Sequence, residues 1–391
     1  MTERVQKLKD FIIDRRYRQT RLAEGVTVTV SGNNTYADTL AVTRAVMAKE
    51  EPVFYENDIF GFFTRLPTYA KTVLTNGEKF GHRANNVTPA YNLLIDRGLR
   101  VVLQELNAHA STAVGEAKEF YNAALETLGI MLDYCETYRA AAKARGFDRL
   151  AAALERVPQE APTSLYEACL FHKILLFFLR QTNDHITLGR FDQYMYPYYQ
   201  MDVDRGASRE ELLETLELYF LSLNVDADTY MGVQQGDNGS SMVLGGFDAD
   251  GRSQFNELSS LCMDASLEVN VIDPKINLRV GKNTPDELYA LGTKMTKKGL
   301  GFPQYCNDDV IVPALIRLGY RPEDAWNYTV AACWEPIIPG LGYDIPNITT
   351  TDLAHITADA VNAHLAECDT FEQLLAFVKD GITRRTPPNA R

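Results

Sequence analysis

Strands and helices alternate through residues 241–332, and this alternation restricts the fold more than any other feature of the chain. Apolar, β-rich runs occur at 241–244, 277–280, 302–306 and 328–332. A loop and then a helical pattern follow each of the first three runs, and a short helical pattern precedes the fourth. Strands that alternate with helices form sheets covered by crossover helices. This region therefore predicts an α/β fold, either a barrel or an open sheet with helices outside.

The chain before this region is predicted to be mainly helical. Apolar residues recur at three- and four-residue spacing in 1–22, 39–50 and 89–106. Helices are also expected over 112–145, 164–181, 208–224, 351–367 and 370–379. Ser208, with Glu211 three residues later, is typical of a helix N-cap. The most apolar run, 168–179, is much shorter than the ~20 residues of a membrane span, so a buried helix is expected.

Composition excludes several classes of partner. The 391 residues are 46% hydrophobic, which permits a large core. The net charge is −13 and no Lys/Arg-rich run occurs, so nucleic acid and membrane are disfavoured as partners. The N-terminus lacks the apolar segment of a secretory signal, so a cytoplasmic location is expected.

No metal site is expected. The six cysteines are widely spaced, which favours neither a zinc site nor a disulfide framework. The segment FDADG (247–251) resembles the start of a calcium loop, but Glu257 falls at the tenth position and not the twelfth. A hairpin-type turn is therefore expected there.

The segment NYTVAACWEPIIPG (327–340) carries the main candidate for chemistry. A predicted strand leads to Cys333, Glu335 follows two residues later, and two prolines and a glycine then require a turn. Cys333 has four interpretations: a buried loop cysteine, a thiolate nucleophile, a metal ligand or a thiyl radical site. A thiyl radical abstracts a hydrogen atom and needs no lowered thiol pKa, while a nearby carboxylate can act as general base. Residues two apart on a strand share a face, which suits the radical interpretation.

The same segment resembles a known motif. AACWEPIIPG (331–340) is similar to the Cys-x-Glu-Pro loop of glycyl radical enzymes, the pyruvate formate-lyase superfamily. Further segments match that family in order and spacing: VTPAYNLLIDRGL (87–99), GRFDQYMYPYYQMD (189–202), VLGG with NELSSLCMDAS (243–266), NLRVGKNTPDELY (277–289) and GFPQYCNDDVIVPAL (301–315). The resemblance spans at least residues 87–345, in the eliminase and decarboxylase branch of the family.

The resemblance implies a fold and a radical mechanism. The family fold is a ten-stranded α/β barrel in which two loops meet at the centre. One loop carries the thiyl cysteine, here Cys333, with Glu335 as general base. The other carries a glycine that stores the radical, which a separate radical SAM activating enzyme installs. The radical resides on the protein with no directly bound cofactor, and strict oxygen sensitivity is implied.

Further substrate-binding candidates follow from the same resemblance. A histidine from the N-terminal half contacts substrate in eliminases of the family, and His82 is the candidate here. Asp184 and His185 lead into the active-site side of the family fold. Trp334 replaces a residue that is commonly small and aliphatic. Asn347 stands where diol dehydratases of the family place a carboxylate. Separately, the loop Asn307, Asp308 and Asp309 either reaches the same cavity or caps the helix expected at 310–318.

The sequence also departs from the family pattern. The Arg-Val-x-Gly-Tyr type motif of the radical glycine does not occur in the printed sequence. The chain resembles only the N-terminal, thiyl-cysteine half, so half of a ten-stranded barrel is expected. We expect a single pyruvate formate-lyase-like domain over 1–391, with a helix-rich part (1–225), a strand–helix part with the Cys loop (226–350) and C-terminal helices (351–391). A half-barrel exposes open sheet edges, so we expect a partner chain that supplies the remaining strands and the glycine. A truncated product is the alternative.

The expected function is that of the thiyl-bearing subunit of a split glycyl radical lyase. It would cleave a C–O, C–N or C–S bond in a small polar substrate by radical elimination. An arylacetate-type radical decarboxylase subunit, which also uses Cys-x-Glu, is an alternative. A non-catalytic regulatory or decoy paralogue that only binds a partner is another, and an isolated fragment without a native role is a third.

Overall fold

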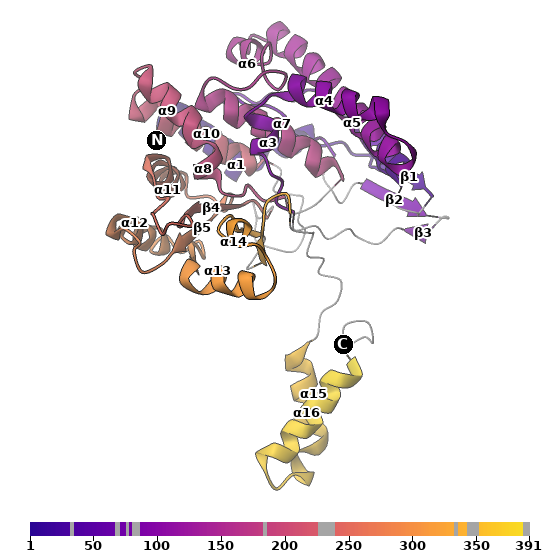
Figure 1. Cartoon of the computed structure of the whole chain (residues 1–391), viewed down its shortest axis with the longest axis vertical. Coiled ribbons are helices and arrows are strands. Elements are labelled where there is room, and N and C mark those ends of the chain that lie inside the picture. The colour runs from indigo at the N-terminus through magenta and orange to yellow at the C-terminus, as the bar shows by residue number, and fades with distance from the viewer. Residues whose placement is uncertain are drawn as a thin grey trace. The chain divides into compact units, whose positions relative to one another are not determined.

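The computed structural model describes residues 1–31, 35–66, 71–75, 78–79, 87–182, 186–225, 239–331, 335–341 and 352–385. The chain divides into two compact units, Met1–Ile345 and Pro346–Arg391. Each unit is described by itself (Figure 1).

Helices dominate the first part of unit 1, as the sequence predicts. They are α1 (Glu3–Ile13), the 3-10 helix η1 (Arg16–Thr20), α2 (Tyr36–Met47), α3 (Asn92–Ile95), α4 (Leu99–Thr112), α5 (Gly115–Ala144), α6 (Asp148–Ala153), α7 (Leu165–Thr182), α8 (Phe191–Tyr194), α9 (Tyr196–Asp204) and α10 (Arg209–Leu223). Ser208 caps α10 in the predicted way, because its side chain accepts from the Glu211 N–H and Glu211 bonds back to the Ser208 N–H. The apolar run in α7 is a buried helix, also as predicted.

A small sheet in the N-terminal part was not predicted. Strand β1 (Val26–Val30) pairs in parallel with β2 (Lys71–Thr75), and β2 pairs antiparallel with β3 (Glu78–Lys79). The sequence VTVTV of β1 alternates β-branched side chains, and its burial alternates as well. This period-2 pattern was the available signal. The expectation that the region is helical is therefore only partly correct.

The central sheet consists of parallel strands in sequence order. Strand β4 (Ser241–Gly245) pairs with β5 (Lys275–Val280), and β5 pairs with β6 (Gln304–Asn307). Parallel bridges continue this arrangement on the β4 side, first from Met242 to Gly189 and then from Ile186 to Val87. Five extended chain segments thus lie side by side in the order in which they occur in the chain.

Helices connect and follow these strands, as Figure 1 shows around β4 and β5. They are α11 (Glu257–Val269), α12 (Asp286–Thr296), α13 (Asp308–Arg317) and the short α14 (Pro322–Ala325). The FDADG segment forms the expected hairpin-type turn, since Phe247 and Ser253 form an antiparallel bridge. The predicted strand–helix alternation of this region is confirmed.

Two final strands form a separate antiparallel pair, β7 (Thr329–Ala331) and β8 (Glu335–Ile337). Strand β7 lies against β4. Val330 of β7 packs in one buried cluster with Val243 of β4 and with Ile338, the residue after β8. This cluster is distinct from the main core of unit 1, which the helices and the central sheet share.

The described cysteines are unpaired. Cys135, Cys169, Cys262 and Cys306 are buried, and Cys368 is partly buried. Burial raises the pKa of the Cys306 thiol to about 11, with a smaller contribution from Asp308. Among the described residues, none of the helices has the length and apolar character of a membrane span.

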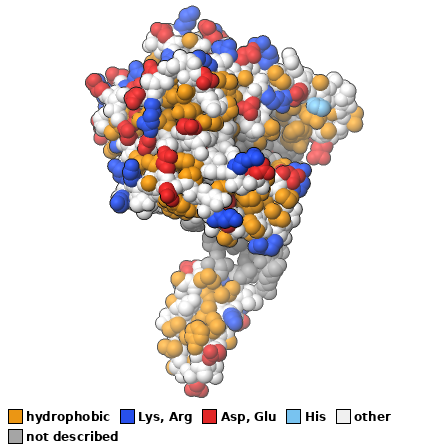
Figure 2. Space-filling view, turned by 60° about the vertical axis from the view of Figure 1, so that its left-hand side comes forward, with side chains coloured by type: hydrophobic (Ala, Val, Ile, Leu, Met, Phe, Trp, Pro, Cys, Tyr) orange, Lys and Arg blue, Asp and Glu red, His pale blue; other side chains and the backbone are white. Residues whose placement is uncertain are grey.

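Unit 2 is a helical pair with little buried surface. It contains α15 (Leu353–His364), the 3-10 helix η3 (Leu365–Glu367) and α16 (Phe371–Arg385). Within 352–385 only Ile356 and Ala360 are buried, while Phe371 is 69% exposed. Figure 2 shows hydrophobic side chains gathered on the visible face of this pair.

Candidate functional site

The β7–β8 pair brackets the predicted Cys loop. Ala331 lies opposite Glu335 in the antiparallel register, and Thr329 lies opposite Ile337. The predicted strand before the cysteine is therefore present. Glu335 opens the returning strand, whereas the sequence reading placed the turn after it. The side chain of Glu335 is partly buried.

Most predicted site residues lie outside the described part of the chain. They are Cys333, Trp334, His82, Asp184, His185 and Asn347. Of the predicted set, the structure places Glu335 alone. The distances from Glu335 to the other six stay untested, and their roles remain predictions.

The described segments that flank these residues in the sequence contact one another. Val87 bridges to Ile186, and the Thr187 N–H donates to the Val87 carbonyl at 3.0 Å. The hydroxyls of Thr88 and Thr187 are 2.6 Å apart. The Gly340 N–H, three residues after β8, donates to the Thr88 carbonyl at 3.2 Å. Segments that lead toward His82, Asp184 and Cys333 are therefore hydrogen-bonded at one place.

Gly340 is suited to this close contact. Its φ of +73° lies in the left-handed region, and a Cβ there would come within 2.8 Å of the Ala90 Cβ. A larger residue would push the segment after β8 away from residues 88–90. The glycine thus permits the return strand to lie against the first parallel segment.

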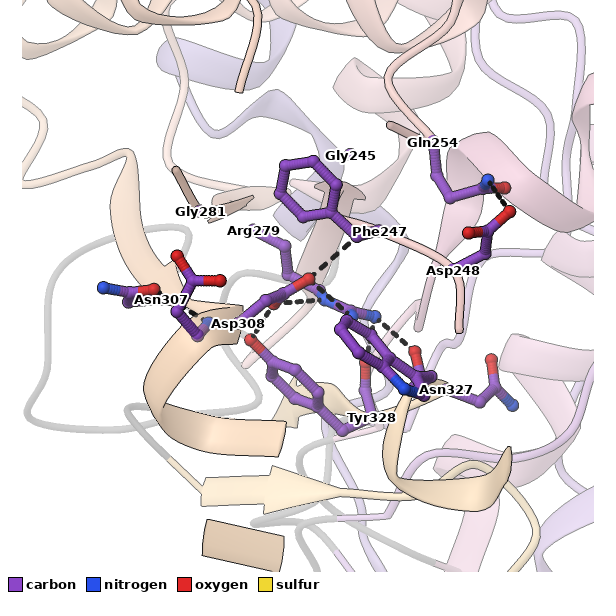
Figure 3. A network of polar contacts seen from close by, with 12 residues as sticks. Gly245, Phe247, Asp248, Gln254, Arg279, Gly281, Asn307, Asp308, Asn327 and Tyr328 are labelled. Atoms are coloured by element: carbon purple, nitrogen blue, oxygen red, sulfur yellow. Dashed lines mark hydrogen bonds and ion pairs between the residues drawn. The ribbon is translucent and has the colours of Figure 1, made fainter. Parts of the chain in front are cut away.

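A buried charged network lies at the start of β7 (Figure 3). Arg279, near the end of β5, donates from Nε and Nη2 to the two carboxylate oxygens of Asp308, at 2.9 and 2.8 Å. Arg279 Nη1 donates to the carbonyls of Trp326 and Tyr328, at 2.9 and 3.1 Å. The Tyr328 hydroxyl donates to Asp308 at 2.7 Å, and the Phe247 N–H donates to it at 3.0 Å. Bidentate geometry and charge make these strong hydrogen bonds.

Packing around Arg279 is tight. Arg279 and Asp308 are both fully buried, and the guanidinium carbon lies 4.1 Å from the centre of the Tyr328 ring. Gly246 has a φ of +90°, and a Cβ there would lie 2.7 Å from Arg279 Nε. Burial raises the pKa of the Tyr328 hydroxyl above its usual value, which keeps it a donor.

A second arginine borders the network. Arg190 donates at 3.4 Å to the carbonyls of Trp326 and Gly245. Burial and the neighbouring Arg279 lower the pKa of Arg190 to about 10. Asp192 accepts from the Gly245 N–H at 2.7 Å and from the Ser259 hydroxyl at 2.5 Å. Burial raises the pKa of Asp192.

Sequence reasoning identified part of this network. Asn307 caps α13 as expected, because its side chain accepts from the Asp309 N–H. Asp308 is the first helical residue but points inward to Arg279. Arg279 and Tyr328 were not recognised. The available signal was an arginine that alternates with Leu278 and Val280 in the β-rich run INLRV (276–280).

The described residues contain no cluster of His, Cys, Asp or Glu that could hold a metal ion. Glu335 is a carboxylate two residues after Cys333 in the sequence.

The chain matches known proteins over most of its length. The model of the family described as "Pyruvate formate lyase-like" matches residues 57–364. A (2S)-3-sulfopropanediol dehydratase from Klebsiella oxytoca is 26% identical over 274 residues, 65% of this chain and 33% of the relative. An isethionate sulfite-lyase from Desulfovibrio desulfuricans is 30% identical over 201 residues, 49% of this chain and 24% of the relative. The chain therefore spans a third or less of the length of these relatives.

The fold agrees with this relationship. The structure of hydroxyproline dehydratase from Clostridioides difficile, solved with trans-4-hydroxy-L-proline bound, superposes with a TM-score of 0.77 at 15% identity. The superposition covers 98% of this chain and 64% of that one. At this identity the likeness concerns the fold alone, a helix-rich α/β arrangement. This chain belongs to the pyruvate formate lyase-like family, within the glycyl radical enzyme superfamily.

Proposed function

We propose that this chain is the thiyl-radical-bearing part of a glycyl radical lyase that acts on a small polar substrate. The observation that carries the proposal is the β7–β8 pair, which places Glu335 opposite Ala331 on either side of the segment that contains Cys333. The hydrogen bond from Gly340 to Thr88 joins this pair to the first parallel segment. Membership of the family supports lyase chemistry.

In the proposed reaction, the Cys333 thiyl radical takes a hydrogen atom from a substrate carbon that bears a hydroxyl group. An S–H bond forms and the C–H bond breaks. Glu335 accepts the hydroxyl proton as general base. A leaving group on the neighbouring carbon then departs with its bonding electrons and receives the proton. The product radical recovers the hydrogen atom from Cys333, which regenerates the thiyl radical.

The remaining predicted residues have roles in this proposal. His82, Asp184 and His185 would contact the substrate from the segments before Val87 and Ile186. Trp334 and Asn347 would line the same space. Two relatives are named as a dehydratase and a sulfite-lyase, which favours elimination, and decarboxylation is the alternative.

A partner that carries the radical glycine is part of the proposal. A radical SAM enzyme would install the radical on that glycine. The partner would also complete a barrel, of which we propose that the five parallel segments are one half. Within the described residues, β6 pairs on one side only. Exposed apolar side chains also occur on β6 and on the helix that follows it, among them Tyr305, Val310 and Leu318. An uncovered strand edge of this kind favours pairing with another strand.

The test is anaerobic co-expression of the chain with its genomic neighbours, followed by activation. We expect a glycine-centred EPR doublet on a co-purifying chain. Turnover would be assayed with (2S)-3-sulfopropanediol and isethionate, the compounds named in two relatives. Cys333→Ala is expected to abolish turnover. Glu335→Gln should slow it by roughly 10²–10⁴-fold, as expected for loss of a general base.

Cys368→Ala is the control, because it removes another thiol and none of the proposed site residues lies within residues 352–385. It should leave turnover unchanged. A stable monomer that captures no partner would contradict the split arrangement. A complex that forms a glycine radical but turns over equally well with Ala at position 333 would contradict the catalytic role. Partner binding without any turnover would favour the regulatory alternative.

A further inference from the structure

The strand that leads to Cys333 begins at a fixed point. Arg279 Nη1 donates to two carbonyls, those of Trp326 and Tyr328, and both precede β7 directly. Cys333 follows Tyr328 by only five residues. The position of these carbonyls therefore sets where β7 starts and in which direction it runs.

The carboxylate that holds Arg279 has no spare capacity. A carboxylate has about four lone-pair sites. Asp308 uses them for Arg279 Nε and Nη2, the Tyr328 hydroxyl and the Phe247 N–H. These donors come from β5, from the start of β7 and from the segment after β4. One carboxylate at the N-terminus of α13 thus ties together three other parts of the fold (Figure 3).

A ligand-binding role does not suit this network. Arg279 and Asp308 are fully buried, and their contacts leave no carboxylate oxygen available to a substrate. Stability alone is also an incomplete account, because a buried ion pair is on average no more stabilising than well-packed apolar residues. The directional hydrogen bonds of this pair instead hold two specific backbone carbonyls before β7.

We propose that Arg279, Asp308 and Tyr328 are positioning residues that fix the base of β7 and thereby the reach of Cys333. This inference rests on the proposed function, since reach matters only if Cys333 reacts. Hydrogen-atom transfer depends steeply on distance, and a displacement of about 1 Å can cost on the order of 10²-fold in rate. The three residues would act through the backbone before β7, where Arg279 holds the carbonyls of Trp326 and Tyr328.

The first measurement reports position without requiring activity. A nitroxide on Cys333 and a second on Lys294→Cys, an exposed position of α12 in the same unit, give a distance distribution by pulsed EPR. Cys368→Ser removes the one described cysteine that is not buried. Tyr328→Phe and Arg279→Lys are the test variants. Tyr320→Phe and Arg317→Lys, both exposed, are their controls.

We expect Tyr328→Phe to widen the distance distribution by at least a half, and Arg279→Lys to widen it about twofold or shift its mean. The controls should match the parent chain. Circular dichroism and a cooperative melt establish that each variant is folded. If Arg279→Lys does not fold, Tyr328→Phe decides the question. A distribution that stays unchanged in a folded variant with a lowered melting temperature would reduce the network to a purely stabilising role.

The second measurement is turnover of the activated complex. A positioning role predicts that Tyr328→Phe lowers kcat by roughly tenfold or more, within the range that a 1 Å displacement allows, while KM changes less than about twofold. Equal kcat in Tyr328→Phe and Tyr320→Phe would overturn the inference. If Cys333→Ala retains full turnover, the proposed function fails instead, and the distance measurement still decides whether the network fixes the strand.

Discussion

Two buried polar regions of unit 1 differ in how fully their polar groups are hydrogen-bonded. At the base of β7, Arg279 and Asp308 are charged partners with nearly complete hydrogen bonding. In the helical core, His172 on α7 is equally buried and receives one polar contact, 2.6 Å from its Nδ1 to the Tyr219 hydroxyl. Its Nε2 is buried without a hydrogen-bond partner in the described structure. Tyr91 packs against the imidazole at 4.2 Å.

The two regions should affect the stability of the protein under different conditions. Burial, with Arg180 and Lys173 nearby, lowers the pKa of His172 to about 3, so this ring is neutral in the folded protein. Arg279, by contrast, lies against a carboxylate that supplies opposite charge and two hydrogen bonds. The paired region should therefore respond to loss of a partner, and the neutral histidine should respond to pH.

Removal of the anchoring carboxylate should have the largest effect. Asp308→Ala leaves a buried guanidinium unpaired and is expected to lower the free energy of unfolding by about 3–5 kcal/mol. Urea denaturation at pH 7.5 measures this. Asp309→Ala is the matched control, because Asp309 is exposed and accepts from the Lys282 N–H. Equal losses of stability in the two variants would contradict the conclusion that the buried Arg279 depends on Asp308.

Two glycine substitutions test how tightly Arg279 is packed. Gly246→Ala and Gly251→Ala both place a side chain at positive φ, +90° and +75°. A Cβ at 251 meets nothing within 4 Å, whereas one at 246 would lie 2.7 Å from Arg279 Nε. Gly251→Ala should cost about 1–2 kcal/mol from backbone strain. Gly246→Ala should cost about 1–3 kcal/mol more through overpacking. Similar melting temperatures for the two variants would show that the Arg279 side chain moves to accommodate the methyl group at little cost in stability.

Acid should weaken the histidine region selectively. In the folded protein His172 has a pKa of about 3, while in the unfolded chain the ordinary value is near 6.5. Between these values the unfolded chain binds more protons, so stability is lost as the pH falls below about 6.5. The contribution is about 2 kcal/mol between pH 7.5 and 5. Urea denaturation at both pH values measures the free energy of unfolding. Its decrease between pH 7.5 and pH 5 should be smaller by this amount in His172→Leu. An identical pH dependence in the variant would contradict the assignment.

The smallest expected effect is the difference in stability loss between two tyrosine-to-phenylalanine variants. Tyr328→Phe removes a hydrogen bond to a charged carboxylate and should cost about 2 kcal/mol, whereas Tyr219→Phe removes one to a neutral imidazole and should cost about 1 kcal/mol. Both side chains are fully buried, so the change in apolar burial is matched. Chemical denaturation of the two variants measures the difference. A reversed order would mean that the carboxylate finds a replacement donor.

Local patterns carried much of the prediction of the fold. The start of α10 was predictable from Ser208, because a cap is a contact between near neighbours in sequence. The strand–helix alternation of 241–332 was readable for the same reason. Strand β1 was missed although its period-2 pattern is local, whereas its pairing with β2, more than 40 residues away, was not readable.

The candidate site was less accessible to sequence reasoning. Glu335 was identified from its spacing to Cys333, but its place at the start of a returning strand depends on pairing with Ala331. Arg279 and Asp308 are 29 residues apart, and nothing in either local pattern indicates that they meet. Long-range polar pairs depend on the packing of whole elements, which a single sequence does not display.

The order of the parallel segments also has a consequence for folding. Val87, Ile186–Gly189, β4, β5 and β6 occur in space in the order in which a ribosome would release them. Each new strand can therefore add to the outer edge of a sheet that already exists, and no strand must insert between two others. Single crossover helices keep the additions of β5 and β6 local, which shortens the loops that must close there and favours stepwise assembly. Strand β6 is then the last of this series to form.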